Sequence, residues 1–227
     1  MSSGRRRGCR DGADGALAAP IAGSVSSWPL ATTARPLGNY VTFGAGIRDF
    51  QYTTDMSVNP QTYDSIKTNG EAHFLGAVWT AMLWEMYWNL VNQYGFDSNL
   101  LDSWTHGGNN LALQLVIDGL KLQPCNPGFV DSRDAILLAD RNLTGGANQC
   151  LIWKAFAKRG LGANADQASP DSTSDGTEDF TVPAAPCGLV QYHFSGFYGG
   201  IKSPPTVNPA NAGSNVSLTF SLSGTRV

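Results

Sequence analysis

The chain has 227 residues, of which 42% are hydrophobic and 15% are charged. This length is enough for one full domain with a smaller appendage, and the composition excludes a wholly disordered protein. The formal net charge of −3 argues against a nucleic-acid partner, which would normally meet a basic face.

The first ten residues include Arg5, Arg6, Arg7 and Arg10, the kind of basic start that opens a signal peptide. No apolar segment follows these arginines, so the chain shows no export signal. No stretch approaches the apolar length that spans a bilayer, so we expect no membrane partner. Other features, described below, are typical of an exported protein, and a truncated sequence is the simplest explanation of the conflict.

Residues 1–35 are rich in Gly, Ala, Ser and Arg and have no periodicity. We interpret them as disordered, or as an incorrectly assigned start of the gene. Residues 36–69 are turn-rich and extended, with at most short strands or a one-turn helix after Asn59-Pro60. The packing anchors that we expect in this segment are aromatic: Tyr40, Phe43, Phe50, Tyr52 and Tyr63.

The strongest helix signal runs from about Glu71 to Val91. Apolar residues recur there as adjacent pairs every four residues, which is the broad stripe of a core helix. Trp84 and Trp88 extend the apolar character to a further face, so we expect burial on most sides. Glu85 lies inside this apolar helix and predicts a structural hydrogen bond or ion pair.

Three further helices are predicted: Asn109–Leu122, a helix from Ser132 as N-cap through Arg141, and one over about Ala147–Arg159. Pro124 follows the first of these helices, and Gly160 and Gly162 follow the last, as is usual at helix ends. Four helices with short connections predict a mainly α fold.

The composition changes after Gly162. Residues 163–186 are rich in Pro, Ser, Thr and Asp and read as a linker. Residues 187–227 contain two β-type segments, Leu189–Phe194 and Ser217–Leu222, with turn residues between them. Two or three strands are too few for an independent sandwich, so we expect an incomplete β-domain.

Cys125 and Cys150 lie in the well-patterned region, and each is flanked by turn residues. A disulfide between them would close a loop of roughly 25 residues and contribute about 3 kcal/mol in the chain-entropy model. We therefore predict this disulfide; the alternative is two small buried thiols. The pairing of Cys9 and Cys187 is left open.

No complete catalytic constellation is evident. The three histidines lie in separate segments and none begins an H-E-x-x-H motif, which would bind zinc. His73 stands near the start of the strongest helix, where it could point into a cleft with Glu71 near enough to orient it. The alternative is a surface histidine. Arg48 lies in an ordered polar turn, and its simpler interpretation is a surface pair with Asp49.

Successive short motifs between residues 36 and 162 resemble those of the fungalysin family of extracellular metallopeptidases. The quoted motifs are Gly46-Ile47-Arg48, Asn59-Pro60-Gln61-Thr62-Tyr63, Glu71-Ala72-His73, Gly76-Ala77-Val78-Trp79, Met82-Leu83-Trp84-Glu85, Leu115-Val116-Ile117-Asp118-Gly119, Leu122-Gln123-Pro124-Cys125-Asn126-Pro127, Ser132-Arg133-Asp134-Ala135-Ile136-Leu137, Thr144-Gly145-Gly146-Ala147-Asn148, and the run Trp153 to Gly162.

The resemblance implies the helical C-terminal lobe of a thermolysin-like catalytic domain. It implies that His73 donates a hydrogen bond to the tetrahedral oxyanion and that Arg48 holds the substrate carbonyl beside the scissile bond. The family's orienting acid is not at its usual place, so Glu71 or Asp64 would have to substitute. The family's zinc ligands and general-base glutamate are missing from this chain.

The resemblance also implies protein or peptide substrates, a secreted location, zinc as cofactor, and the missing N-terminal lobe of the same domain as a partner. We therefore interpret the chain as a fragment of a secreted zinc metalloendopeptidase that is inactive alone. One alternative is a non-catalytic secreted binding or adhesion module with a β tail. Another is nucleic-acid binding through the arginine-rich start. Asn142-Leu143-Thr144 and Asn215-Val216-Ser217 fit the glycosylation sequon.

Overall fold

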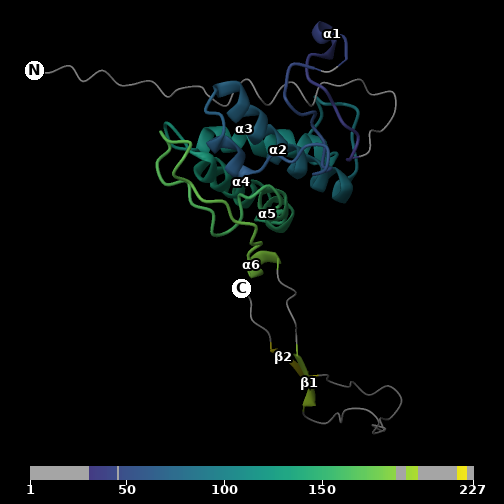
Figure 1. Ribbon diagram of the computed structural model, residues 1–227. Helices are drawn as coiled ribbons and strands as arrows, with labels where there is room; N and C mark the ends of the chain where they lie inside the picture. The colour runs from purple at the N-terminus through teal and green to yellow at the C-terminus, as the bar shows by residue number, and fades with distance from the viewer. Residues whose placement is uncertain (1–30, 45, 188–192, 199–218, 224–227) are drawn as a thin grey trace, which may run out of the picture. The chain divides into compact units, whose positions relative to one another are not determined.

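The computed structural model describes the chain in four stretches: 31–44, 46–187, 193–198 and 219–223. The chain divides into two units, Met1–Pro183 and Ala184–Val227. The described part of the first unit consists mainly of helices, so the predicted fold class is confirmed (Figure 1). The prediction for residues 1–30 lies outside the described residues.

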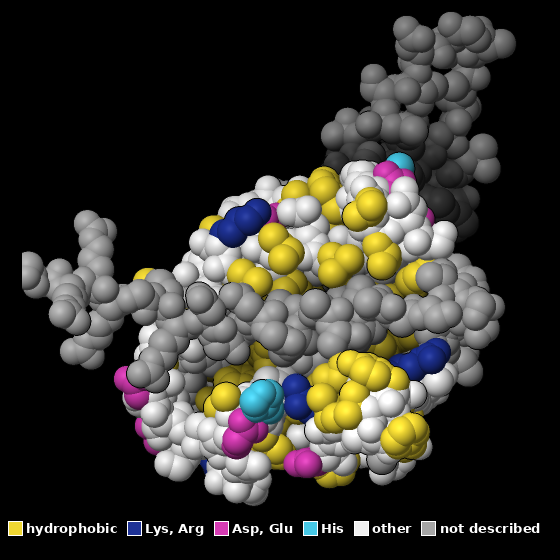
Figure 2. Space-filling model, turned by 90° about the horizontal axis from the view of Figure 1, so that it is seen from above, with side chains coloured by type: hydrophobic (Ala, Val, Ile, Leu, Met, Phe, Trp, Pro, Cys, Tyr) yellow, Lys and Arg dark blue, Asp and Glu magenta, His cyan; other side chains and the backbone are white. Residues whose placement is uncertain are grey.

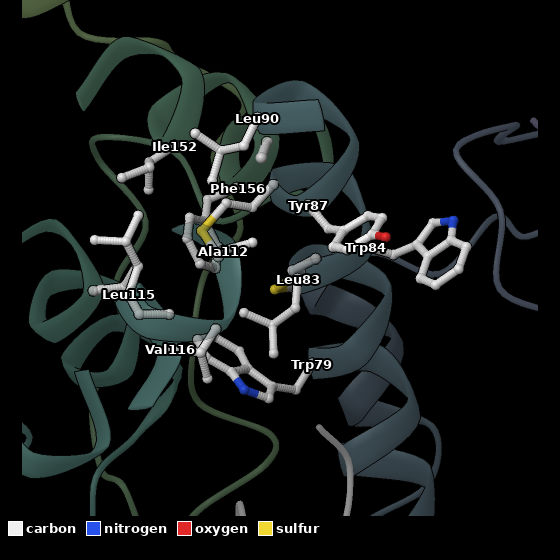
Figure 3. Packing of buried hydrophobic residues seen from close by; sticks show 14 of the residues in the cluster. Trp79, Leu83, Trp84, Tyr87, Leu90, Ala112, Leu115, Val116, Ile152 and Phe156 are labelled. Atoms are coloured by element: carbon white, nitrogen blue, oxygen red, sulfur yellow. The ribbon is translucent and has the colours of Figure 1, made fainter. Parts of the chain in front are cut away.

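Helix α2 (Ala72–Tyr94) is the central element of the first unit and packs against α3 (Gly108–Leu122) and α5 (Gln149–Lys158). Fourteen of its 23 residues are buried, which confirms the expected burial on most sides. In Figure 3, Trp84 and Tyr87 project from α2 on a different side from the Leu115 and Ile152 cluster. Aromatic packing on that further face explains why α2 has no polar stripe.

The junction between α2 and α3 depends on Gly108. A Cβ added there would lie 2.1 Å from the carbonyl oxygen of Leu90, so only glycine permits this backbone approach. The Gly108 N–H donates to the carbonyl of Gly95, at 2.8 Å. Gly95 ends α2 with φ 78°, and this confirms it as the predicted stop.

Helix α4 (Phe129–Thr144) starts earlier than predicted, so Ser132 is not its N-cap. The Asp131 carboxylate accepts the N–H of Gly128 at 3.0 Å, and Gly128 is the N-cap, four residues before the predicted one. The Ser132 hydroxyl instead donates to Gln123 Oε1 at 3.2 Å. A serine inside the first turn is easily mistaken for a cap, because both positions favour the same residue types.

The segment before α2 holds α1 (Asn39–Thr42) and the 3-10 helix η1 (Tyr63–Lys67). Tyr52 and Tyr63 are each 3% exposed, so two of the predicted packing anchors are confirmed. Phe50 is half-buried. The Tyr52 ring packs against Trp84 of α2 and the Tyr63 ring against Phe129, so these two side chains hold the extended segment against the helices.

Tyr40 and Phe43 are not packing anchors, because they are 83% and 97% exposed. The base of their turn is closed by the Gly46 N–H, which donates to Thr42 Oγ1 at 2.7 Å, and by an Ile47–Leu37 backbone hydrogen bond. This closure holds α1 out from the helices. Figure 2 views the molecule from the side on which α1 lies in Figure 1, and hydrophobic side chains gather on this face.

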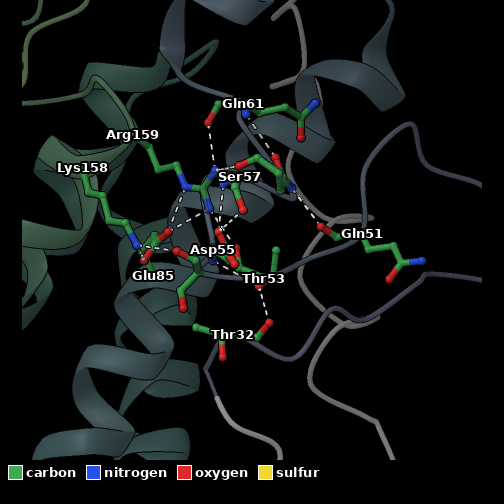
Figure 4. A network of polar contacts seen from close by, with 11 residues as sticks. Thr32, Gln51, Thr53, Asp55, Ser57, Gln61, Glu85, Lys158 and Arg159 are labelled. Atoms are coloured by element: carbon green, nitrogen blue, oxygen red, sulfur yellow. Dashed lines mark hydrogen bonds and ion pairs between the residues drawn. The ribbon is translucent and has the colours of Figure 1, made fainter.

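Arg159 anchors the extended segment to the helices (Figure 4). Its guanidinium is fully buried and donates to the carboxylate of Glu85 in α2. It also donates to three backbone carbonyls of the extended segment, those of Thr53, Asn59 and Gln61. The ion pair predicted for Glu85 is therefore confirmed.

Residues 163–183 belong with the helices, although their composition predicts a linker. The N–H of Ala163 donates to the carbonyl of Thr181 at 2.8 Å, and Asp166 forms an antiparallel bridge with Thr177. Gln167 Oε1 accepts the N–H of Asp131 at 3.0 Å, at the start of α4. Backbone and side-chain hydrogen bonds therefore hold this loop together and bind it to the helices.

The cysteine pairing also differs from the prediction. Cys125 and Cys150 are both disulfide-bonded, but not to each other, so the predicted Cys125–Cys150 disulfide is wrong, and so is the alternative of two buried thiols. Four cysteines allow three connectivities. Loop-closure entropy grows only slowly with loop length, so chain spacing alone does not select among them.

The second unit begins with α6 (Ala184–Cys187) and contains the strands β1 (His193–Tyr198) and β2 (Thr219–Ser223). The strands are antiparallel, with His193 opposite Ser223 and Tyr198 opposite Thr219. The predicted strands begin a few residues earlier, at 189 and 217, where the chain lies outside the described residues. No described helix combines the length and the apolar character needed to cross a membrane.

Candidate functional site

Glu71 is the N-cap of α2. Its Oε2 accepts the backbone N–H groups of His73 and Phe74, at 2.9 and 3.1 Å. The N–H of Glu71 donates in turn to Asn69 Oδ1 at 3.0 Å. A carboxylate at this position satisfies the unpaired amides of the first turn and complements the positive end of the helix dipole. This cap fixes the direction in which the chain presents His73.

The second carboxylate oxygen of Glu71 contacts the His73 ring, with Oε1 2.5 Å from Nδ1. Hydrogen bonds from the His73 backbone N–H and from its ring hold the pKa of Glu71 below the usual range of a glutamate. An ionised carboxylate only accepts hydrogen bonds, so Nδ1 carries the proton. Nε2 has no hydrogen-bond partner among the described residues, and the His73 side chain is 74% exposed.

Of the two acids considered from the sequence, Glu71 is the one that contacts His73. Asp64 instead forms an ion pair with Lys67, with Nζ 2.7 Å from Oδ1. The Glu71 pairing is local, spanning two residues at the start of the helix, and for that reason it could be predicted from the sequence.

Arg48 is half-buried, and its Nε is enclosed without a hydrogen-bond partner among the described residues. The described part of the chain shows no ion pair of Arg48 with Asp49 and no hydrogen bond of Arg48 with His73 or Glu71. A buried, unsatisfied guanidinium donor costs free energy. Because Nε is enclosed, it is not accessible to a bound molecule in this structure.

A group that sequence reasoning missed lies in the loop between α2 and α3. Asp97, Asp102 and His106 bring three possible ligand atoms within 4.8 Å of one another. His106 Nδ1 lies 3.0 Å from Asp102 Oδ2, four residues apart, so the spacing of these two residues is the signal that could have found the pair. Asp102 and His106 are exposed, and exposed acidic groups of this kind are common without a metal.

The helices and the contact between His73 and Glu71 describe the site. Comparison with known proteins identifies the family to which the chain belongs. The model of the family described as fungalysin metallopeptidase (M36) matches residues 13–165, about two thirds of the chain. The chain belongs to this family. The match starts upstream of Pro36, where the resemblance seen in the sequence begins.

The chain is also similar to curated extracellular metalloproteinases of fungi. It is 51% identical to extracellular metalloproteinase MEP of Neosartorya fischeri over 146 residues, which are 63% of this chain and 22% of the relative. Identity to the Aspergillus fumigatus protein is 49% over 146 residues, with the same shares covered. Identity to the Pyrenophora tritici-repentis protein is 46% over 147 residues, again 63% of this chain and 22% of the relative. The chain spans about a fifth of the length of these relatives.

The family name implies a bound metal. The residues of this chain do not fit a catalytic zinc centre, because the sequence has no H-E-x-x-H pair of histidines. In the described part, His73 and His106 lie in different segments and each contacts a carboxylate of its own. No catalytic step is therefore derived through a metal on this chain.

Proposed function

We propose that this chain is the helical C-terminal lobe of the catalytic domain of a secreted zinc metalloendopeptidase. Residues 36–162 form the lobe in this proposal, and residues 187–227 are part of a β-domain. The family membership and the named extracellular metalloproteinases support a proteolytic activity on proteins or peptides. No residue of this chain is proposed as a zinc ligand.

The observation that carries the proposal is the contact between Glu71 and His73 at the start of α2. In peptide hydrolysis the carbonyl oxygen gains negative charge as the tetrahedral intermediate forms. Because Glu71 holds the proton on Nδ1, His73 can donate from Nε2 to that oxygen only as the imidazolium. Glu71 orients the ring through its contact with Nδ1, and it is the positioning residue in the proposal.

Arg48 has the second role, which is to hold the substrate. In this proposal a terminal N–H of its guanidinium donates to the carbonyl of the residue beside the scissile bond. Such a contact fixes the peptide before reaction and orients the reacting carbonyl. The support for this role is the matched Gly46-Ile47-Arg48 motif and the half-buried position of the side chain.

The proposal is tested in a chimera. The 146-residue segment of the Neosartorya fischeri relative that matches this chain is replaced by the corresponding residues of this chain, and hydrolysis of a peptide substrate is measured. We expect His73→Ala to lower kcat by roughly 100- to 1,000-fold with a small change in KM. His106→Ala is the matched control, because that exposed histidine also contacts a carboxylate through Nδ1.

Two results would contradict the proposal. One is equal activity of the His73→Ala and His106→Ala chimeras. The other is a chimera that keeps the relative's circular dichroism and melting temperature but has no activity, which would favour the non-catalytic binding module. The 227-residue chain alone is expected to show no chelator-sensitive proteolysis and no stoichiometric zinc.

A further inference from the structure

The outward face of α4 is exposed at a regular spacing. Asp134, Leu138, Arg141 and Asn142 are exposed, while Ala135, Ile136, Leu137, Ala139 and Asp140 between them are buried. The separations of three and four residues place the exposed side chains along one side of the helix. Asn142 lies in the last turn, next to the exposed Gly145 that follows the helix.

The Asn142 amide has no hydrogen bond to any described residue, and Asn142 begins the sequon Asn142-Leu143-Thr144. Short sequons occur by chance, so the motif alone decides little. In the structure the Asn142 side chain is exposed, so its amide is accessible from solvent. The structure also shows disulfide-bonded cysteines at 125, 150 and 187, which are typical of proteins that mature in an oxidising secretory compartment.

Leu138 is an apolar residue on the same exposed side of α4 as Asn142. It is 40% exposed and lies four residues before Asn142, so the two side chains are neighbours on the helix surface. An oligosaccharide on Asn142 would extend over Leu138 and shield its apolar surface from water. In the bare chain this leucine faces solvent.

We propose that Asn142 carries an N-linked oligosaccharide when the chain passes through a eukaryotic secretory pathway. The donor class is a lipid-pyrophosphate-linked oligosaccharide. The amide nitrogen forms a bond to C1 of the first sugar, the bond from C1 to the pyrophosphate oxygen breaks, and the nitrogen loses one proton. This inference depends on the secreted location in the proposed function and not on proteolysis.

The fold determines when the sugar can be added. In the folded chain Thr144 Oγ1 donates to Asp140 Oδ1 at 2.6 Å and accepts the N–H of Ala147 at 3.1 Å. The sequon hydroxyl is therefore already engaged in the C-terminal turn of α4. Transfer precedes the formation of this turn, and the same hydroxyl then closes the helix end.

The experiment expresses the full chain behind a cleavable signal peptide in yeast and analyses the secreted product by mass spectrometry, before and after an N-glycosidase. We expect the peptide containing Asn142 to carry a glycan. Asn142→Gln removes that glycan, and Asn215→Gln, which changes the sequon outside the described residues, leaves it in place. Thr144→Ser keeps the sequon and retains the modification.

A secreted chain whose Asn142 peptide is unmodified overturns the proposal. Because transfer occurs before folding, loss of stability in a variant does not affect this readout. The signal peptide supplies the route, so a missing glycan counts against Asn142 and leaves the proposed secreted location untouched. Folded, unglycosylated chain added to microsomal membranes is expected to stay unmodified, and modification of that folded chain would contradict the proposed order of events.

Discussion

Arg159 and Glu85 form a buried ion pair that joins the end of α5 to the middle of α2. Arg159 Nε and one terminal nitrogen lie 2.9 and 2.8 Å from Glu85 Oε1. Burial lowers the pKa of Arg159, and the charge of Glu85 opposes this effect. The remaining guanidinium hydrogens bind backbone carbonyls of residues 53–61, so one side chain connects two helices to the segment between Arg48 and His73.

Replacing Arg159 by methionine is expected to destabilise the chain by about 3–5 kcal/mol, because Glu85 would stay buried with only Lys158 as partner. Urea unfolding followed by circular dichroism measures the loss. Lys158→Ala is the control: the Lys158 side chain is 41% exposed, and its removal is expected to cost about 1 kcal/mol or less. Equal losses for the two variants would contradict a dominant role for Arg159.

Gly108→Ala is expected to weaken the junction between α2 and α3. The new methyl group would lie 2.1 Å from the Leu90 carbonyl oxygen, so the helices must separate, at a cost of about 1–3 kcal/mol. Gly70→Ala is the control, because its methyl group would meet Thr173 at an ordinary 3.5 Å. A thermal unfolding midpoint that falls no further for Gly108→Ala than for Gly70→Ala would refute the close approach.

The helices could be predicted because their signals are local. The paired apolar residues between Glu71 and Val91 identify a buried helix, and Gly95 ends it as expected. The start of α4 lies earlier than the sequence predicts. Ser132 and Asp131 are both plausible first-turn residues, and only the contact of Asp131 with Gly128 shows where the helix begins.

Features that depend on distant contacts could not be predicted in this way. Tyr40 and Phe43 are residue types typical of a core, but they are 83% and 97% exposed, because whether an aromatic side chain is buried depends on what the rest of the fold places beside it. The 163–183 segment has a linker's composition, yet it is bound by contacts such as the one between Gln167 and Asp131. The partners of Cys125 and Cys150, which do not pair with each other, depend on the fold, which chain spacing does not encode.

The candidate site also combines one local contact, which the sequence could suggest, with one feature that depends on packing, which it could not. The Glu71–His73 contact joins residues two apart at a helix start, and the sequence could suggest it. The enclosed Nε of Arg48 depends on how the turn packs, so the sequence could name the residue but not its unsatisfied donor. The roles of both residues in catalysis stay predictions.

The cap of α2 makes stability depend on pH in the acidic range. The pKa of Glu71 is lower in the folded chain than the ordinary glutamate value, chiefly because of the hydrogen bond from the His73 backbone N–H. Its contribution is therefore fully present above the ordinary pKa and is lost as the pH falls through the folded pKa. Urea unfolding of the parent chain and of Glu71→Gln should show a difference that shrinks on acidification in this window. A difference that stays constant through it would contradict the charged cap.

The last prediction concerns the orientation of His73 in the chimera. Glu71 Oε1 lies 2.5 Å from His73 Nδ1, so this contact fixes the direction in which Nε2 points. Glu71→Gln weakens the contact and should lower kcat with little change in KM, because the donor is then less well aligned with the developing oxyanion. Asp102→Asn makes the same chemical change beside His106 and should leave kcat unchanged. An equal effect of the two substitutions on kcat would exclude Glu71 as the residue that positions His73.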